Sequence, residues 1–273
     1  MANPKILFFI AFVFVGSLLA GCDPYQKLLK STDYDLKFAK AKEYYNKGEC
    51  EKAIPLFQEL MTIYKGTKDV ENLYYYYAYA HYCNQDYLMA SHYFKSFVDV
   101  YPKSEYTENA MYMVGYCAYL LSPRISLDQE DTRRAIDNLQ MFINQYPESP
   151  LVEKSNGLID GLRAKLEQKA YDNAMLYYNI RSYKSAITSF KNLLIEFPDT
   201  HRQEEVVFLS LKSNFLLAQN SVDAKKEERY QATISAYTEF IDKYPQSKYL
   251  REAERIFSLS EAQIQQIIKN KKS

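Results

Sequence analysis

The sequence contains no tryptophan, few glycines and prolines, and no excess of charge of either sign. With only 7 glycines and 9 prolines in 273 residues, the composition is atypical of β-rich and of disordered proteins, and it favours helices. The 34 basic and 34 acidic side chains cancel, so the chain has no net positive field to attract nucleic acid. We therefore expect a helical protein that does not bind nucleic acid.

Residues with catalytic potential are also scarce. The three histidines do not have the spacing of metal ligands, and the sequence has no glycine-rich phosphate loop, HExxH pattern or nucleophile elbow. We interpret His81 as a packing or groove-lining residue, with a role as ligand or base as the alternative. The sequence thus predicts a non-enzymatic protein without a metal or a cofactor.

Tyrosine, by contrast, is abundant, with 27 residues, and the chain repeats one aromatic-rich segment five times. The clearest copy is 135–149, in which apolar residues follow the 3.6-residue period of an amphipathic helix up to Pro147. Every copy has a small residue, a large apolar residue four positions later and a closing aromatic residue, which proline follows in all copies but the first. The small residues are Ala53, Ala90, Ala135, Ala186 and Thr233, and the residues four positions later are Phe57, Phe94, Leu139, Phe190 and Tyr237.

These columns predict packed helix pairs. A small residue lets two helices approach each other, the aromatic residue one turn later fills the space between them, and proline ends the helix. A serine or threonine that follows each closing position can cap the next helix. The spacing matches the tetratricopeptide repeat, a helix-turn-helix of about 34 residues. We therefore predict an all-α tetratricopeptide-repeat superhelix of about five helix pairs with a C-terminal capping helix.

Several copies are extended by additional residues. Residues 121–131 form an insert between the two helices of the third copy, and 151–168 predict extra turns in a long first helix of the fourth. Residues 220–228 predict a polar loop in the fifth copy, and 249–268 predict the final helix. We place repeats 1–3 in residues 33–150, and repeats 4–5 with the capping helix in residues 151–273.

The first residues have the pattern of an export signal. Lys5 precedes an apolar run that is too short to span a bilayer comfortably. The run ends in Leu18-Leu19-Ala20-Gly21-Cys22, which resembles the bacterial lipobox. We predict that residues 1–21 are removed, that Cys22 carries lipid and that 22–32 form a tether; the alternative is an ordinary signal peptide with a Cys22 that pairs elsewhere. Asp23 leaves the choice between inner and outer membrane open.

Three cysteines remain in the mature chain, at positions 50, 83 and 117, and none has a CxxC spacing. An odd number of thiols leaves at least one unpaired in an oxidising compartment. We expect buried free thiols, with a bridge between Cys50 and Cys83 as the alternative.

The run Tyr74-Tyr75-Tyr76-Tyr77 is the most suggestive binding feature. Four consecutive residues point around the whole helix, so they cannot all belong to the core. The concave face of a helical-repeat stack is a usual site for an extended peptide, whereas packing against adjoining repeats is the alternative for each tyrosine.

The chain resembles the BamD family of outer-membrane protein assembly lipoproteins over nearly its whole length. The most specific part of the resemblance is the third copy with its insert. The matching elements, in order, are Gly115-Tyr116, Ser122-Pro123-Arg124, Leu127-Asp128-Gln129, Thr132, Ala135-Ile136, Phe142-Ile143, Tyr146-Pro147 and Ser149.

The resemblance implies a subunit of the β-barrel assembly machine, anchored by lipid to the periplasmic face of the outer membrane. It implies two partners, which are the POTRA domains of a BamA-like barrel subunit and unfolded outer-membrane β-barrel proteins. Carried to this sequence, the substrate-peptide groove would involve Tyr44, Tyr74, Tyr77 and His81. Docking would involve Arg124, Asp128 and Gln129 of the insert, together with surface of the last two repeats.

Two other classes of protein share parts of this pattern. Another lipid-anchored repeat scaffold, such as a secretin pilotin or a cell-wall synthesis adaptor, would have the anchor and the helices without needing the insert motifs. A glycan-binding repeat lipoprotein usually has stacking tryptophans and a large additional ligand region, and this chain has neither.

Overall fold

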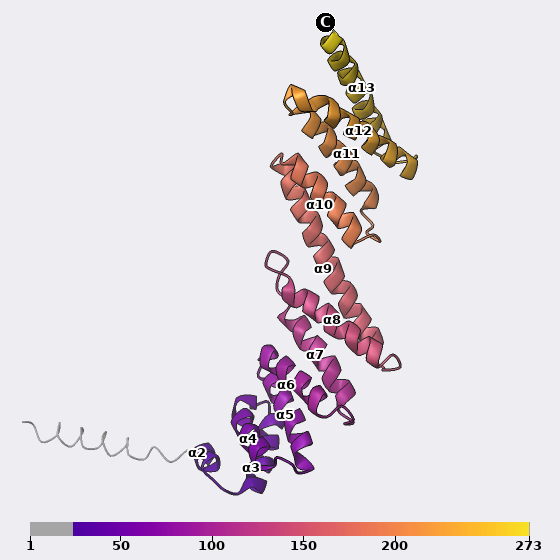
Figure 1. The fold of residues 1–273 in the computed structure, drawn as a ribbon. Coiled ribbons are helices and arrows are strands. Elements are labelled where there is room, and N and C mark those ends of the chain that lie inside the picture. The colour runs from indigo at the N-terminus through magenta and orange to yellow at the C-terminus, as the bar shows by residue number, and fades with distance from the viewer. Residues whose placement is uncertain (1–23, 273) are drawn as a thin grey trace, which may run out of the picture. The chain divides into compact units, whose positions relative to one another are not determined.

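The computed structural model describes residues 24–272, and all of the regular structure in that range is helical (Figure 1). The predicted signal segment 1–21 and Cys22 lie outside the described residues. The helices are α2 (Pro24–Leu29), α3 (Tyr34–Asn46), α4 (Cys50–Ile63), α5 (Asp69–Cys83), α6 (Tyr87–Val100), α7 (Thr107–Leu121), α8 (Glu130–Gln145), α9 (Val152–Asn179), α10 (Tyr183–Glu196), α11 (Gln203–Gln219), α12 (Asp223–Lys243) and α13 (Leu250–Lys272).

Helices α3 to α12 form five successive pairs, and α13 follows them, which confirms the predicted all-α fold of five helix pairs with a C-terminal helix. The first pair begins as the sequence indicates, because the Asp33 carboxylate accepts a hydrogen bond from the Leu36 N–H at 3.0 Å. The pair turns at Gly48, whose φ of 77° suits glycine. Helix α2 is an addition: it lies within the segment 22–32 that the sequence predicted as a tether.

The repeated columns lie in the core, as their packing role predicted. All five small residues and four of the five residues one turn later are 0 % exposed, while Tyr237 of the last copy is half-buried. Gly115 of α7 marks a close helix approach, because a Cβ placed on it would lie 2.7 Å from Cδ2 of Leu139 in α8. The aromatic-plus-small pattern therefore builds the helix interfaces.

The turns between successive pairs, and the turn from the last pair to α13, use one chemistry. In each of the five turns a hydroxyl oxygen accepts a hydrogen bond from the backbone N–H two residues further on, at the start of the next helix. The acceptor residues and their distances are Thr67 (3.3 Å), Ser104 (3.1 Å), Ser149 (3.2 Å), Thr200 (3.1 Å) and Ser247 (3.0 Å). The first turn lacks the proline and has Gly66 at a φ of 83° instead.

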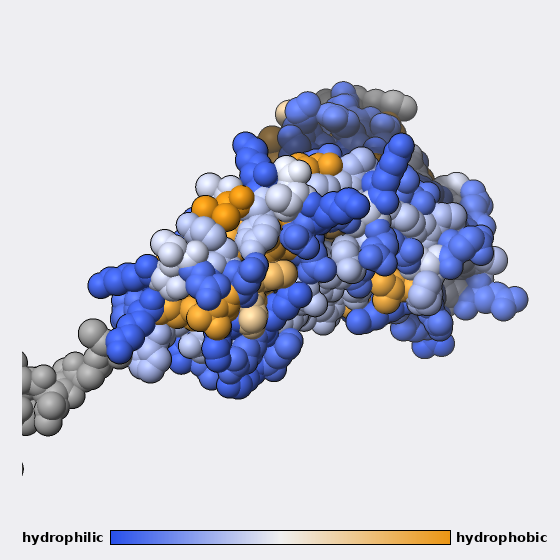
Figure 2. All heavy atoms as spheres, turned by 90° about the horizontal axis from the view of Figure 1, so that it is seen from below, coloured by the Kyte–Doolittle hydropathy of each residue, from blue (hydrophilic) through white to orange (hydrophobic). Residues whose placement is uncertain are grey.

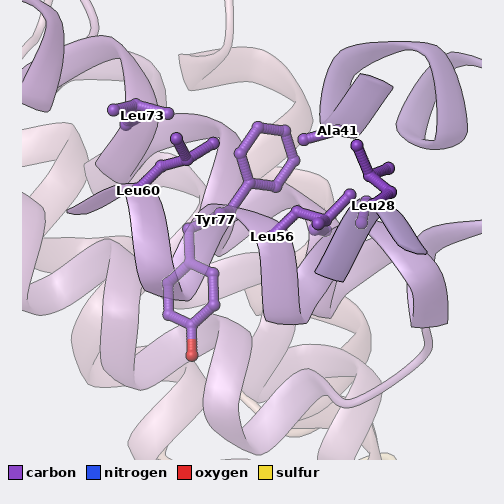
Figure 3. Close-up of a cluster of buried hydrophobic side chains, with 9 residues drawn as sticks. Leu28, Ala41, Leu56, Leu60, Leu73 and Tyr77 are labelled. Atoms are coloured by element: carbon purple, nitrogen blue, oxygen red, sulfur yellow. The ribbon is translucent and has the colours of Figure 1, made fainter. Parts of the chain in front are cut away.

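The chain forms two compact units. Among the described residues, unit 1 comprises 24–122 and 134–156, and unit 2 comprises 123–133 and 157–272. One core cluster of unit 1 gathers Leu28, Ala41, Leu56 and Tyr77 with their neighbours (Figure 3). A cluster of unit 2 is built around Phe208, Phe215 and Phe240 with residues of α13.

Two expectations from the sequence are wrong. Cys50 and Cys83 form a disulfide, with Cα atoms 6.0 Å apart, because the start of α4 and the end of α5 lie side by side. Only Cys117 is a buried free thiol among the described residues, and burial raises its pKa to about 12. The second wrong expectation is the length of the polar loop in the fifth pair. Residues 223–228 form the first turns of α12, so the loop comprises only residues 220–222. The predicted long first helix of the fourth pair, in contrast, is confirmed as α9.

Candidate partner-binding surfaces

The tyrosine run on α5 packs against helices on several sides. Tyr76 stacks on Phe57 of α4, with ring centroids 6.1 Å apart. The Tyr75 hydroxyl donates to Asn109 Oδ1 of α7 at 2.9 Å, and the hydroxyl of Tyr79 donates to the same atom. Much of the cluster therefore holds neighbouring pairs together, as the packing alternative predicted.

Three of the four predicted groove residues lie together beside Tyr93 of α6. The ring of Tyr77 is 4.5 Å from that of Tyr93 and 4.8 Å from that of His81, and Tyr74 is 6.2 Å from Tyr93. Tyr77 is 3 % exposed and His81 8 %, whereas Tyr74 and Tyr93 are half-buried. Tyr74 and Tyr93 thus present the accessible surface, and Tyr77 and His81 lie beneath it. We call these four residues the tyrosine surface.

Burial governs the electrostatics of this surface. Burial raises the pKa of Tyr77, whose hydroxyl donates to the Tyr93 hydroxyl at 3.4 Å. Burial likewise lowers the pKa of His81, and the Asp86 carboxylate, 3.5 Å from its Nδ1, opposes that shift. Neutral hydroxyl and imidazole groups at neutral pH suit contacts with apolar and amide groups of a peptide.

Tyr44, the fourth predicted groove residue, has different ring neighbours. Its ring contacts Tyr25 of α2 at 5.6 Å, and Lys52 Nζ lies 5.4 Å from its centroid. It packs at the edge of the same core cluster as Tyr77, but the structure gives it no ring contact with Tyr74 or Tyr77. The predicted groove residues therefore divide into a group of three and a separate Tyr44.

The insert of the third pair is a loop whose inward-facing polar groups are hydrogen-bonded. Gln129 is 1 % exposed, and its Nε2 donates to the carbonyls of Arg124 at 3.0 Å and Leu127 at 2.9 Å. Its Oε1 accepts from the buried Thr132 hydroxyl at 2.7 Å. The Asp128 carboxylate accepts from the Glu130 N–H at 2.8 Å and so caps α8.

Two lysines of α9, which the sequence analysis missed, hold the same loop from the other side. Lys165 Nζ donates to the Pro123 carbonyl at 3.0 Å, and Lys169 Nζ donates to the carbonyls of Ile125 and Leu127 at 2.9 and 2.7 Å. Two lysines four residues apart lie on the same face of a helix and repel each other. Such a pair is favourable only where nearby acceptors bind both ammonium groups, and this spacing is the one signal of the contact in the sequence.

Of the three predicted docking residues, only Arg124 and Asp128 are exposed. The Arg124 guanidinium makes no ion pair within the described part of the chain, and the neighbouring Leu127 side chain is 49 % exposed. Gln129 instead fixes the loop from inside. The loop therefore displays a cation and an apolar side chain on a backbone with its carbonyls already bonded, which favours docking without further ordering.

Residues 24–272 contain no group of three histidine, cysteine, aspartate or glutamate side chains arranged to hold a metal ion. Within the same range, none of the helices combines the length and apolar character needed to cross a bilayer. What the described residues do provide is an all-α stack of helix pairs, a class whose members use their surfaces to bind other proteins.

The chain belongs to the YfiO family of outer membrane lipoproteins, whose model matches residues 32–229. It is 21% identical to the outer membrane protein assembly factor BamD of Caulobacter vibrioides over 221 residues, which cover 80% of this chain and 72% of that protein. Similar solved structures include the TPR2AB domain in a pHSP90 complex of yeast Sti1, at 11% identity and a TM-score of 0.40. The match covers 84% of this chain and 98% of that one. A tetratricopeptide repeat protein from Parabacteroides merdae matches at 13% identity and a TM-score of 0.36, over 88% of this chain and 98% of that one.

Proposed function

We propose that this chain is a non-enzymatic, lipid-anchored subunit of the β-barrel assembly machine at the periplasmic face of the outer membrane. The observation that carries the proposal is the family match over residues 32–229, joined by the similarity to an outer membrane protein assembly factor. In this role the protein docks on the POTRA domains of a BamA-like barrel subunit and receives segments of unfolded β-barrel proteins.

The insert supports the docking part of the proposal. Its carbonyls are bonded to Gln129, Lys165 and Lys169, so docking requires little loss of backbone freedom. Arg124 supplies an unpaired guanidinium that suits a carboxylate on the partner, and Leu127 supplies apolar area beside it. Surface of the last two helix pairs would complete the contact.

The tyrosine surface supports the substrate part of the proposal. A segment of an unfolded barrel protein is extended, with unpaired backbone groups and alternating aromatic side chains. Tyr74 and Tyr93 offer ring faces and hydroxyls to such a segment, and the buried Tyr77 and His81 fix the positions of those rings. Tyr44, beside α2, would extend the contact.

Purification of the mature lipoprotein in detergent tests the proposal, with identification of the proteins that remain bound. We expect to recover a barrel subunit with POTRA domains. Arg124→Ala should reduce that recovery, because it removes the unpaired guanidinium, while Lys95→Ala, the loss of an exposed cation on α6, should not.

Recovery of a secretin or a murein synthase in place of the barrel subunit would favour the alternative of a pilotin or a cell-wall synthesis adaptor. Equal recovery with Arg124→Ala and with the unsubstituted protein would remove the insert from the docking site. A Cys22→Ala form that stays membrane-bound would contradict the lipid anchor.

A further inference from the structure

Lys37 of α3 is the largest polar side chain in the buried interior of unit 1, at 1 % exposure. Its Nζ donates to both carboxylate oxygens of Glu59 in α4, at 2.7 and 2.6 Å, and to the Leu29 carbonyl at 2.9 Å. Leu29 is the last residue of α2, so the ammonium bonds one of the carbonyls that the end of a helix leaves without a partner. Lys37 therefore ties the end of α2 to the first helix pair.

Two further contacts hold α2 in place. The Leu28 side chain is buried and points into the core cluster, beside Ala41 and Leu56 (Figure 3). At the start of the helix, the Tyr25 hydroxyl donates to the Lys52 carbonyl in α4 at 2.9 Å. Helix α2 is thus bonded near both ends and packed in the middle, which a loose tether would not be.

The segment between the predicted lipidation site Cys22 and this fixed helix is very short. Pro24, the first residue of α2, comes two residues after Cys22. Even a fully extended chain spans only roughly 7 Å over two residues. A lipid on Cys22 therefore places α2, and the part of α4 that is hydrogen-bonded to it, within reach of the lipid headgroups.

We infer that α2 and the adjoining part of α4 form a membrane-contact surface that rests on the phosphate-bearing headgroups of the bilayer in which Cys22 is anchored. The inference rests on the lipid anchor of the proposed function and goes beyond it. The anchor alone leaves the folded protein free to turn, whereas α2, held by Lys37, presents the first helix pair to the bilayer in one orientation.

The chemistry of the surface suits headgroups better than acyl chains. Lys27 and Lys30 are exposed and make no ion pair with another described residue, and residues 24–31 contain no acidic side chain, although Asp23 precedes them. Two cations attract lipid phosphates by about 1 kcal/mol each near an anionic surface. Figure 2 shows hydrophobic residues in several separate patches among hydrophilic ones on the face that it draws.

Photo-crosslinking to lipid tests the inference. The lipoprotein is expressed whole, its acylation on Cys22 is verified by mass spectrometry, and it is placed in vesicles of phosphatidylethanolamine and phosphatidylglycerol. A photoreactive residue replaces exposed Gln26 on α2, Lys52 on α4 or, as a control in the same unit, exposed Lys103 between α6 and α7. We expect about tenfold more lipid adducts at positions 26 and 52 than at position 103, because the short anchor raises the local lipid concentration.

Two changes separate the contributions of the anchor and of Lys37. A flexible linker of about ten Gly and Ser residues between Asp23 and Pro24 leaves the fold untouched and should reduce adducts at both positions, because it lowers the local concentration of lipid around them. Lys37→Met should keep adducts at position 26, next to the anchor, and reduce those at position 52. Lys27→Gln with Lys30→Gln should lower the yield at position 26, by about fivefold for each lysine in phosphatidylglycerol-rich vesicles.

Equal adduct yields at positions 26, 52 and 103 would overturn the membrane-contact surface, and yields that the linker does not change would remove the short anchor from the account. Unchanged yields at position 52 in folded Lys37→Met would remove Lys37 from the account. Neither result bears on recovery of the barrel subunit in detergent, so failure of this inference is distinct from failure of the proposed function.

Discussion

The tyrosine surface of unit 1 and the insert of unit 2 reach a defined geometry in different ways. In unit 1 the side chains proposed for recognition also pack the helices, since Tyr77 is 3 % exposed and contacts Tyr93. In unit 2 the insert is held by Gln129 and Lys169, and the Arg124 guanidinium forms no ion pair with another described residue. Recognition and packing are therefore shared in unit 1 and separate in unit 2.

This difference determines what a substitution reports. A change in the tyrosine surface alters both stability and binding, so each variant needs a stability measurement beside its affinity. A substitution of the exposed Arg124 in the insert leaves the core intact, so a change in docking can be attributed to the loss of that side chain.

The largest expected effect comes from the equivalent core residues Phe94 and Phe190, both 0 % exposed. Replacing either by alanine should lower the free energy of unfolding by about 3–5 kcal/mol, as measured by urea denaturation. Phe94 follows Tyr93 of the tyrosine surface on α6 and packs against Tyr75 and Tyr79 of α5, so Phe94→Ala should shift that surface and weaken binding of barrel-protein C-terminal peptides, whereas Phe190→Ala should not. Equal peptide affinities in the two folded variants would contradict the shared role of packing and recognition in unit 1.

Loss of the disulfide should have the next largest effect. The bridge joins residues 33 positions apart, and removing a crosslink of that length lowers the free energy of unfolding by roughly 2–4 kcal/mol through the entropy of the unfolded chain. Cys50→Ala with Cys83→Ala should therefore lower the melting temperature, while Cys117→Ala, which breaks no bridge, serves as the control. Recovery of the barrel subunit through the insert should be unchanged at temperatures where the variant is folded.

Gln129→Leu tests the insert from inside. It removes the hydrogen bonds of Gln129 to the carbonyls of Arg124 and Leu127 and to the Thr132 hydroxyl, which should lower the free energy of unfolding by about 1–3 kcal/mol. Because the loop then loses its fixed form, recovery of the barrel subunit should fall as well. Gln140→Leu, at an exposed position of α8, is the matched control and should change neither quantity measurably. Full docking by Gln129→Leu would mean that the loop need not be fixed.

Much of the fold follows from the sequence because the packing columns are local and recur. The small residue, the aromatic one turn later and the closing hydroxyl occupy the positions that their chemistry predicted, and Ala90, Phe94 and Ser104 show all three roles in one copy. Such patterns need only helix periodicity and turn chemistry, both of which are set by neighbouring residues. The disulfide, in contrast, depends on how two helix ends meet, and spacing alone favoured free thiols.

The interactions that the sequence did not predict are those between a lysine and distant carbonyl groups. Lys169 bonds carbonyls more than 40 residues away, and Lys37 is buried although lysine is usually exposed. Backbone carbonyls carry no residue-specific signal, so their partners become visible only in three dimensions. For the same reason Gln129, taken from the family resemblance as a docking residue, proves to be a buried bonding residue, while its part in docking stays a prediction.

The smallest expected effect is at Tyr74, one of the two accessible members of the tyrosine surface. Its ring is half-buried among Tyr93, Phe97 and Tyr101, with centroids 6.1 to 6.2 Å away, so Tyr74→Ala should lower the free energy of unfolding only by about 1 kcal/mol. Loss of one aromatic contact should weaken C-terminal peptides of barrel proteins by about 3- to 10-fold, as measured by fluorescence anisotropy. Tyr77→Phe keeps the buried ring and removes only the hydroxyl bonded to Tyr93, so it should preserve affinity within about twofold. If Tyr74→Ala binds peptides with unchanged affinity, the tyrosine surface serves only to pack the helices, and unit 1 does not combine packing with recognition.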